Sequence, residues 1–133
     1  MNWSNLEAPS LDDLEALARA SFAQLPAEFR SLVQGIAFVV QDFLDEETIK
    51  DLGLESEFDL LGLFHGANLA ARQANRGRPE PTMILLYRRS ILDYWAEHGE
   101  MLGAIVRHVL VHEIGHHLGL SDDAMHAIEN DGE

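Results

Sequence analysis

The sequence predicts an α+β fold, in which helices pack on a small mixed or antiparallel sheet. Three short apolar runs, at 36–40, 59–66 and 82–87, have the length and composition of strands. Residues 11–24 repeat their apolar side chains at helical spacing, which predicts an amphipathic helix. The longer apolar run at 105–118 is typical of a buried helix.

The N-terminal third is expected to supply two helices and the first strand. Ser10 suits the N-cap of the helix over 11–24, with an aspartate at the capping-box offset. Pro26 can begin a second helix over 27–33, because its fixed φ suits a first helical turn. The strand at 36–40 follows a glycine that ends this helix.

The middle of the chain is expected to hold the other two strands. One or two helical turns at 46–52 precede the strand at 59–66. Residues 67–81, rich in asparagine, glycine and proline, are expected to form a long polar hairpin loop to the strand at 82–87. A helix at 88–95 then begins the helical C-terminal third.

Two further helices are expected after Gly99, one over about 100–118 and a short one over 122–130. Gly115 within the longer helix costs about 1 kcal/mol relative to alanine, so another element or a substrate should pass close to the backbone there. Met125 is expected to be a core methionine.

Composition restricts the class of protein and of partner. Residues 1–133 are expected to form one domain, with 47% apolar residues and a net charge of −14. Such acidity repels nucleic acid and anionic membranes, so neither is expected as a partner. Cysteine is absent, so any metal must bind histidine and carboxylate. No signal peptide or membrane-spanning stretch is visible, and we expect a cytoplasmic protein.

The most informative pattern is H-E-x-x-H-x-x-G-x-x-D, which begins at His112. His112 and His116 lie four residues apart on one helix face, about 5–6 Å apart at Cβ, so both can reach one ion. Glu113 lies about 100° round the helix and can reach a water on that ion. After a glycine C-cap, Asp122 can supply an oxygen ligand. The pattern predicts a Zn²⁺ site of His112, His116 and Asp122 with an open fourth position, as catalytic zinc requires. The alternative is a buried helix with two satisfied core histidines.

Neighbouring polar residues offer other assignments. His108 and His116 are separated by about 12 Å of helix, so they cannot share one ion. We expect His108 to be a supporting or core residue, and His117 to point away from the ligand face. Asp123 is the direct rival of Asp122, although it suits the first turn of the last helix. Three further histidines have open roles: His65 at a strand end, His98 in a loop, and His126 one helical turn beyond Asp122.

These motifs resemble the minimal zincin-like metallopeptidases, small bacterial one-domain proteins that are minigluzincin-like. The H-E-x-x-H segment matches the zincin signature. D-L-L-G-L-F-H-G at 59–66 and I-L-L-Y-R-R-S-I-L at 84–92 look like the family's companion motifs. The resemblance extends over about residues 25–129.

The resemblance implies a zincin-like fold, a short sheet with a backing helix and an active-site helix. His112 and His116 match the family's metal ligands, and Glu113 matches its general base. Asp122 stands where aspartate-type zincins carry an aspartate. An edge strand would bind an extended peptide by strand addition, with 84–87 and 61–64 as candidates for that edge.

The expected function is zinc-dependent peptide hydrolysis. Glu113 accepts a proton from the metal-activated water and later delivers it to the leaving amine. Tyr87 and Arg88 are candidates for stabilising the oxyanion. The alternative is that Tyr87 is an aromatic residue of the strand and Arg88 is a solvated base. The alternative function is a metal-binding regulatory or interaction module with a zincin fold and little or no proteolytic activity.

Overall fold

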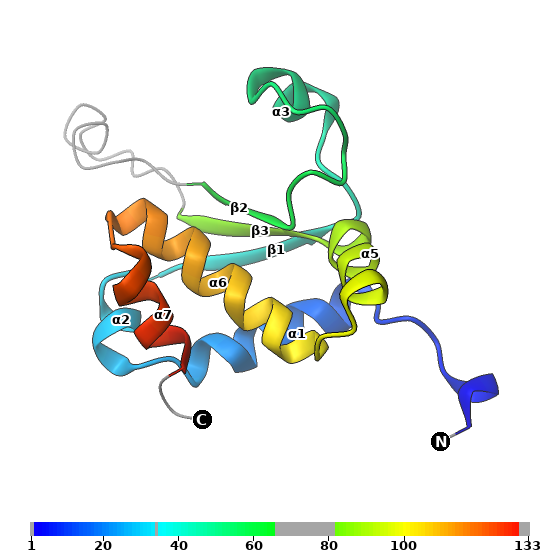
Figure 1. Cartoon of the computed structure of the whole chain (residues 1–133), viewed down its shortest axis with the longest axis horizontal. Coiled ribbons are helices and arrows are strands. Elements are labelled where there is room, and N and C mark those ends of the chain that lie inside the picture. The colour runs from blue at the N-terminus through cyan, green and yellow to red at the C-terminus, as the bar shows by residue number, and fades with distance from the viewer. Residues whose placement is uncertain (1, 34, 66–81, 131–133) are drawn as a thin grey trace.

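A computed structural model describes residues 2–33, 35–65 and 82–130, and its centre is a three-stranded mixed sheet (Figure 1). The strand order is β1-β3-β2, with β1 at Ala37–Gln41, β2 at Gly62–His65 and β3 at Met83–Tyr87. Strand β1 pairs parallel to β3, and β2 pairs antiparallel to it. The α+β class and the mixed sheet are confirmed.

Strand β3 is the central strand, which corrects one prediction. Its backbone groups are bonded to β1 on one side and β2 on the other. The segment at 84–87 is therefore not available for strand addition, and its proposal as a peptide-binding edge was wrong. Strand β2, which overlaps the other candidate segment at 61–64, does lie at an edge of the sheet.

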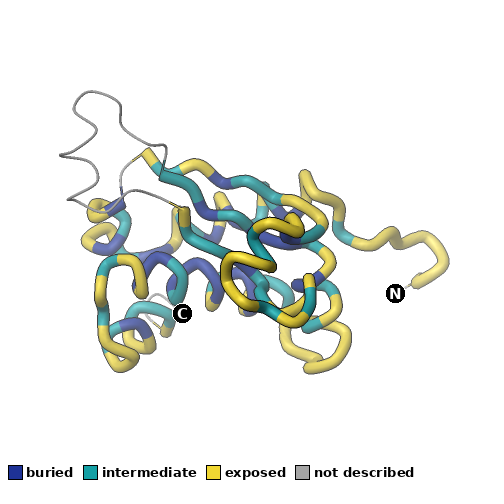
Figure 2. The backbone as a smooth tube through the Cα atoms, turned by 90° about the horizontal axis from the view of Figure 1, so that it is seen from above, coloured by how far each residue is buried: buried dark blue, intermediate teal, exposed yellow. Residues whose placement is uncertain are grey.

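Helices α1 (Leu11–Ala23) and α6 (Leu102–Leu118) pack on one face of the sheet, and α7 (Asp122–Asn130) packs on α6 (Figure 1). Figure 2 shows that the segment before α1 extends away from this body and is exposed. The remaining described helices are η1 (Trp3–Asn5), α2 (Ala27–Ser31), α3 (Glu46–Asp51) and α5 (Arg88–His98). None of the described helices is both long and apolar enough to cross a membrane.

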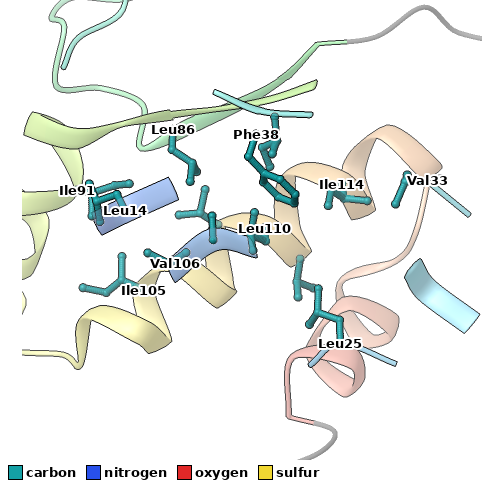
Figure 3. Close-up of a cluster of buried hydrophobic side chains, with 14 of the residues drawn as sticks. Leu14, Leu25, Val33, Phe38, Leu86, Ile91, Ile105, Val106, Leu110 and Ile114 are labelled. Carbon is teal, nitrogen blue, oxygen red and sulfur yellow. The ribbon is translucent and has the colours of Figure 1, made fainter. Parts of the chain in front are cut away.

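The core lies between the sheet and the two helices (Figure 3). Leu14 from α1, Leu86 from β3 and Leu110 from α6 are fully buried within one cluster. Along β3, Ile84 and Leu86 are buried, whereas Leu85 between them is only half-buried. The sheet thus buries one face, as the period of two in a strand requires.

Local signals placed most elements correctly. Ser10 caps α1 through a full capping box with Asp13, as predicted. Strand β2 begins at Gly62 rather than at Asp59, because the Asp59 carboxylate accepts hydrogen bonds from the backbone N–H groups of Glu55 and Ser56 and closes a turn there. The predicted loop at 67–81 lies outside the described residues.

The prediction that His98 is a loop residue was wrong. Helix α5 continues to His98, whose ring nitrogen Nδ1 lies 3.0 Å from the carbonyl oxygen of Tyr94. Its ring also stacks on the Tyr94 ring. The helix ends at Gly99, which adopts φ 67° as a left-handed C-cap.

Gly115 lies at a close contact between α6 and α7. A Cβ added at Gly115 would lie 2.6 Å from Cγ of Met125, which is fully buried. The close neighbour that the sequence predicted at Gly115 is therefore another helix, and Met125 is a core residue.

We expect Gly115→Ala to destabilise the protein by about 1–2 kcal/mol, because overpacking against Met125 exceeds the helix-propensity gain. Gly103→Ala is the matched control in the same helix, since its Cβ would meet nothing within 4 Å. This control should be neutral or slightly stabilising in urea unfolding. In a Met125→Ala background, Gly115→Ala should no longer destabilise. Equal stability of the Gly115→Ala and Gly103→Ala variants would contradict the packing argument.

Candidate metal centre

Helix α6 carries three histidines at intervals of four residues, and it ends where the sequence predicts. Gly119 adopts φ 76° as the C-cap, and its N–H bonds back to the carbonyls of Gly115 and His116. The chain then turns into α7, where the Ser121 hydroxyl accepts a hydrogen bond from the N–H of Ala124 at 3.1 Å. Helix α7 therefore returns along α6.

His112 and His116 lie on neighbouring turns of α6, as predicted. Their ring centroids are 6.0 Å apart in an edge-to-face arrangement. The His112 side chain is 26% exposed, whereas His116 is exposed. Two imidazoles on adjacent turns can supply two nitrogen ligands to a metal.

Glu113 is half-buried beside this pair. Desolvation by burial raises the pKa of its carboxyl above the ordinary value, and the charge of protonated His116 partly opposes that rise. A raised pKa makes the carboxylate a stronger base, which suits the predicted role in proton transfer.

Asp122 is the first residue of α7 and is exposed. Its carboxylate does not belong to the three-residue group of possible ligands that the described part of the chain brings together. Asp123 is also exposed in the first turn of α7. The assignment of Asp122 as third ligand stays a prediction.

The group that the structure does bring together is His108, His112 and Glu129, with their ligand atoms all within 4.8 Å of one another. Oε1 of Glu129 lies 2.8 Å from Nδ1 of His108, and Oε2 lies 3.2 Å from Nε2 of His112. The two imidazole rings stack with centroids 4.0 Å apart. His108 is thus a partner of Glu129, and its 54% exposed side chain shows that it is not a core residue.

Sequence reasoning missed Glu129. The available signal was its place four residues after Met125, because residues at that spacing share a helix face. Once Met125 is taken as a core residue facing α6, Glu129 must lie toward α6 as well. The position is reinforced by Arg107, whose Nε donates to the backbone carbonyl of Glu129 at 2.7 Å.

Two other candidates, His117 and Arg88, have structural partners. His117 stacks on Phe64 of β2 with ring centroids 4.0 Å apart. The Arg88 guanidinium donates to the carbonyl of Pro9 at 2.6 Å and to the carboxylate of Asp42 at 3.1 Å, so it ties the N-terminal segment to the sheet. Its side chain is 22% exposed and bonded to these two partners, so it is not a freely solvated base.

Tyr87 is buried at the end of β3. Burial raises the pKa of its hydroxyl to about 12, with smaller contributions from the charges of Asp45 and Glu113. The hydroxyl therefore keeps its proton at neutral pH and can only act as a neutral hydrogen-bonding group.

The donor set fits zinc. Imidazole nitrogen and carboxylate oxygen are both ordinary zinc ligands, and the chain has no thiolate to compete with them.

A family described as zincin-like metallopeptidase matches residues 33–132, which include the whole sheet, α6 and α7. The chain belongs to this family. A search of curated proteins found no match.

The family match confirms the recognition made from the motifs at 59–66, 84–92 and the H-E-x-x-H segment. Zincin-like metallopeptidases are metal-dependent, so the family implies a metal, usually zinc. The match begins at residue 33, after α1, which packs on α6 from outside the matched region.

We expect Glu113→Gln to stabilise the metal-free protein at neutral pH. The raised pKa means that the fold favours protonated Glu113. The contribution of Glu113 to the free energy of unfolding is fully present below about pH 4, near its pKa in the unfolded chain. It is lost as the pH rises through its higher pKa in the folded protein. The variant should therefore match wild type near pH 4 and exceed it near pH 8 in urea unfolding with chelator present.

Glu7→Gln, at an exposed glutamate, controls for the loss of one formal charge. If Glu113→Gln and Glu7→Gln changed stability equally at both pH values, the desolvation of Glu113 would be refuted.

Proposed function

We propose that this chain is a zinc-dependent peptide hydrolase in which His112, His116 and Asp122 hold the metal and Glu113 is the general base. One observation carries the proposal. Two imidazoles lie on adjacent turns of α6 with a half-buried carboxylate beside them, in a member of the zincin-like metallopeptidases.

Bound zinc supplies a Lewis acid and lowers the pKa of water. Glu113 accepts the proton that the attacking water releases and donates it to the leaving amine. Its partial burial raises the pKa of its carboxyl and so brings that pKa nearer to neutral pH. Tyr87, which stays protonated, remains a candidate hydrogen-bond donor to the oxyanion.

The substrate we propose is a peptide in extended conformation, bound along β2. The N–H of Tyr87 donates to the carbonyl of Leu61 at 3.0 Å. Hydrogen-bonded pairs alternate along an antiparallel ladder, so Leu63 also faces β3, whereas the backbone groups of Gly62 and Phe64 face the edge. Two residues with outward N–H and C=O groups can pair with an added strand.

The alternative is a regulatory or interaction module that binds metal and hydrolyses little. The contact between Nε2 of His112 and Glu129 favours it, because it engages one of the proposed metal ligands. Activity of the zinc-loaded protein decides between the two functions.

We expect Glu113→Gln to lower hydrolysis of a peptide library by about 10²- to 10⁴-fold, the usual contribution of general-base catalysis. Zinc content, measured by elemental analysis, should be unchanged because Glu113 is not a ligand. If zinc-loaded wild type shows no turnover of casein or of the library, the protein is the regulatory module.

A second prediction concerns the third ligand. Asp122→Asn should weaken zinc binding by at least about tenfold, since it removes an anionic oxygen from the metal. Asp123→Asn, one residue away in the same helical turn, is the matched control and should leave the zinc dissociation constant unchanged. Equal effects of the two substitutions would remove Asp122 from the site.

A further inference from the structure

We propose that the chain has a second divalent-cation site, formed by His108, His112 and Glu129, which shares His112 with the proposed catalytic site. We call it the histidine–glutamate site. It goes beyond the proposed function, because it uses two residues outside the H-E-x-x-H motif and does not depend on hydrolysis.

The first support is the spacing of the ligand atoms. Ligands of tetrahedral zinc lie about 2.0–2.2 Å from the metal, and hence about 3.3 Å from one another. Oε2 of Glu129 lies 3.2 Å from Nε2 of His112, and the third ligand atom, on His108, is within 4.8 Å of both. A cation can therefore enter with only small side-chain movements.

The second support is the anchoring of Glu129. Arg107 donates from Nε to the Glu129 carbonyl at 2.7 Å and from a terminal nitrogen to the Ile128 carbonyl at 3.3 Å. These bonds hold the end of α7 against α6. The Glu129 side chain is 20% exposed, so its carboxylate is presented to the two histidines from a partly buried, anchored position.

The third support is space beside the ligands. A cavity of about 210 Å³ is bordered by His108 and Glu129. Its other walls come from three elements or their flanks: Leu61 before β2, Tyr94 on α5, and Glu100, Ala104 and Ile105 around the start of α6. The cavity gives room for waters that complete the coordination of a cation.

The contacts in the metal-free chain are compatible with loading. A neutral imidazole carries one N–H and one lone pair, and exchange of tautomer turns the nitrogen that faces Glu129 from donor into ligand. The Glu129 carboxylate then binds a cation instead of accepting hydrogen bonds from the two imidazole N–H groups. Two imidazoles and one carboxylate suit Zn²⁺ and also Co²⁺.

The two sites exclude one another. His112 contacts Glu129 through Nε2, and a neutral ring offers one lone pair, so it serves one cation at a time. His108 and His116 are about 12 Å apart along α6, too far to share an ion. When a cation occupies the histidine–glutamate site, His112 therefore cannot bind a second cation together with His116.

The test is Co²⁺ titration of the metal-free full chain, followed by visible absorption and by calorimetry. His116→Ala removes the catalytic pair but leaves the histidine–glutamate site intact. This variant should still bind one equivalent of Co²⁺. Adding Glu129→Gln or His108→Ala to it should weaken that binding at least about tenfold. Adding His126→Ala, at an exposed histidine on α7, is the control and should change nothing.

Circular dichroism of each variant distinguishes loss of a ligand from loss of fold. If folded His116→Ala binds no Co²⁺, or binds it equally with and without Glu129→Gln, the histidine–glutamate site is overturned. Metal binding by wild type would then still support the proposed hydrolase. If zinc-loaded wild type lacks turnover while His116→Ala binds Co²⁺, the hydrolase fails and the second site stands.

Discussion

The candidate centre depends on the close contact between α6 and α7. Gly115 leaves out the side chain that would collide with Met125, and this lets the two helices approach. At the other end of α7, Arg107 holds the carbonyls of Ile128 and Glu129. These two contacts fix the rotation of α7 about its own axis. Every carboxylate that α7 can present to the histidines of α6 is placed by that rotation.

The helical path between these contacts explains which acid meets which histidine. Helix α7 runs back along α6, because Met125 lies at Gly115 whereas Glu129 lies at His108, a full two turns earlier in α6. Asp122, three residues before Met125, therefore lies toward the C-terminal end of α6. Asp122 and Glu129 thus lie toward opposite ends of the row of three histidines.

The sequence predicted the parts of this arrangement that local chemistry determines. Ser10, Gly99 and Gly119 end or begin helices through backbone groups within a few residues, so their roles are readable from the chain alone. Likewise, H-E-x-x-H places both histidines on one helix face because four residues make one turn. The start of α7 follows from the same kind of signal, since the Ser121 hydroxyl accepts from the N–H of Ala124.

What the sequence could not supply was non-local. Strand order places β3 between β1 and β2, and nothing in the residues 84–87 distinguishes a central strand from an edge strand. The pairing of Glu129 with His108 joins residues 21 positions apart and depends on how two helices pack. Even so, the cue existed, since the helix face of Glu129 follows from a core Met125.

The negative net charge of the chain favours cation binding, and the row of three histidines in α6 offers nitrogen ligands for a cation. The chain has 23 acidic and 9 basic residues, so its net charge attracts cations in general. Only where imidazole lone pairs meet a carboxylate of restricted freedom does that general attraction become a site. His112 stands at the centre of the row, flanked by His108 on the Glu129 side and His116 beside Glu113. Under the proposed function, which neighbour it joins decides whether a cation lies next to Glu113 or one helical turn away from it.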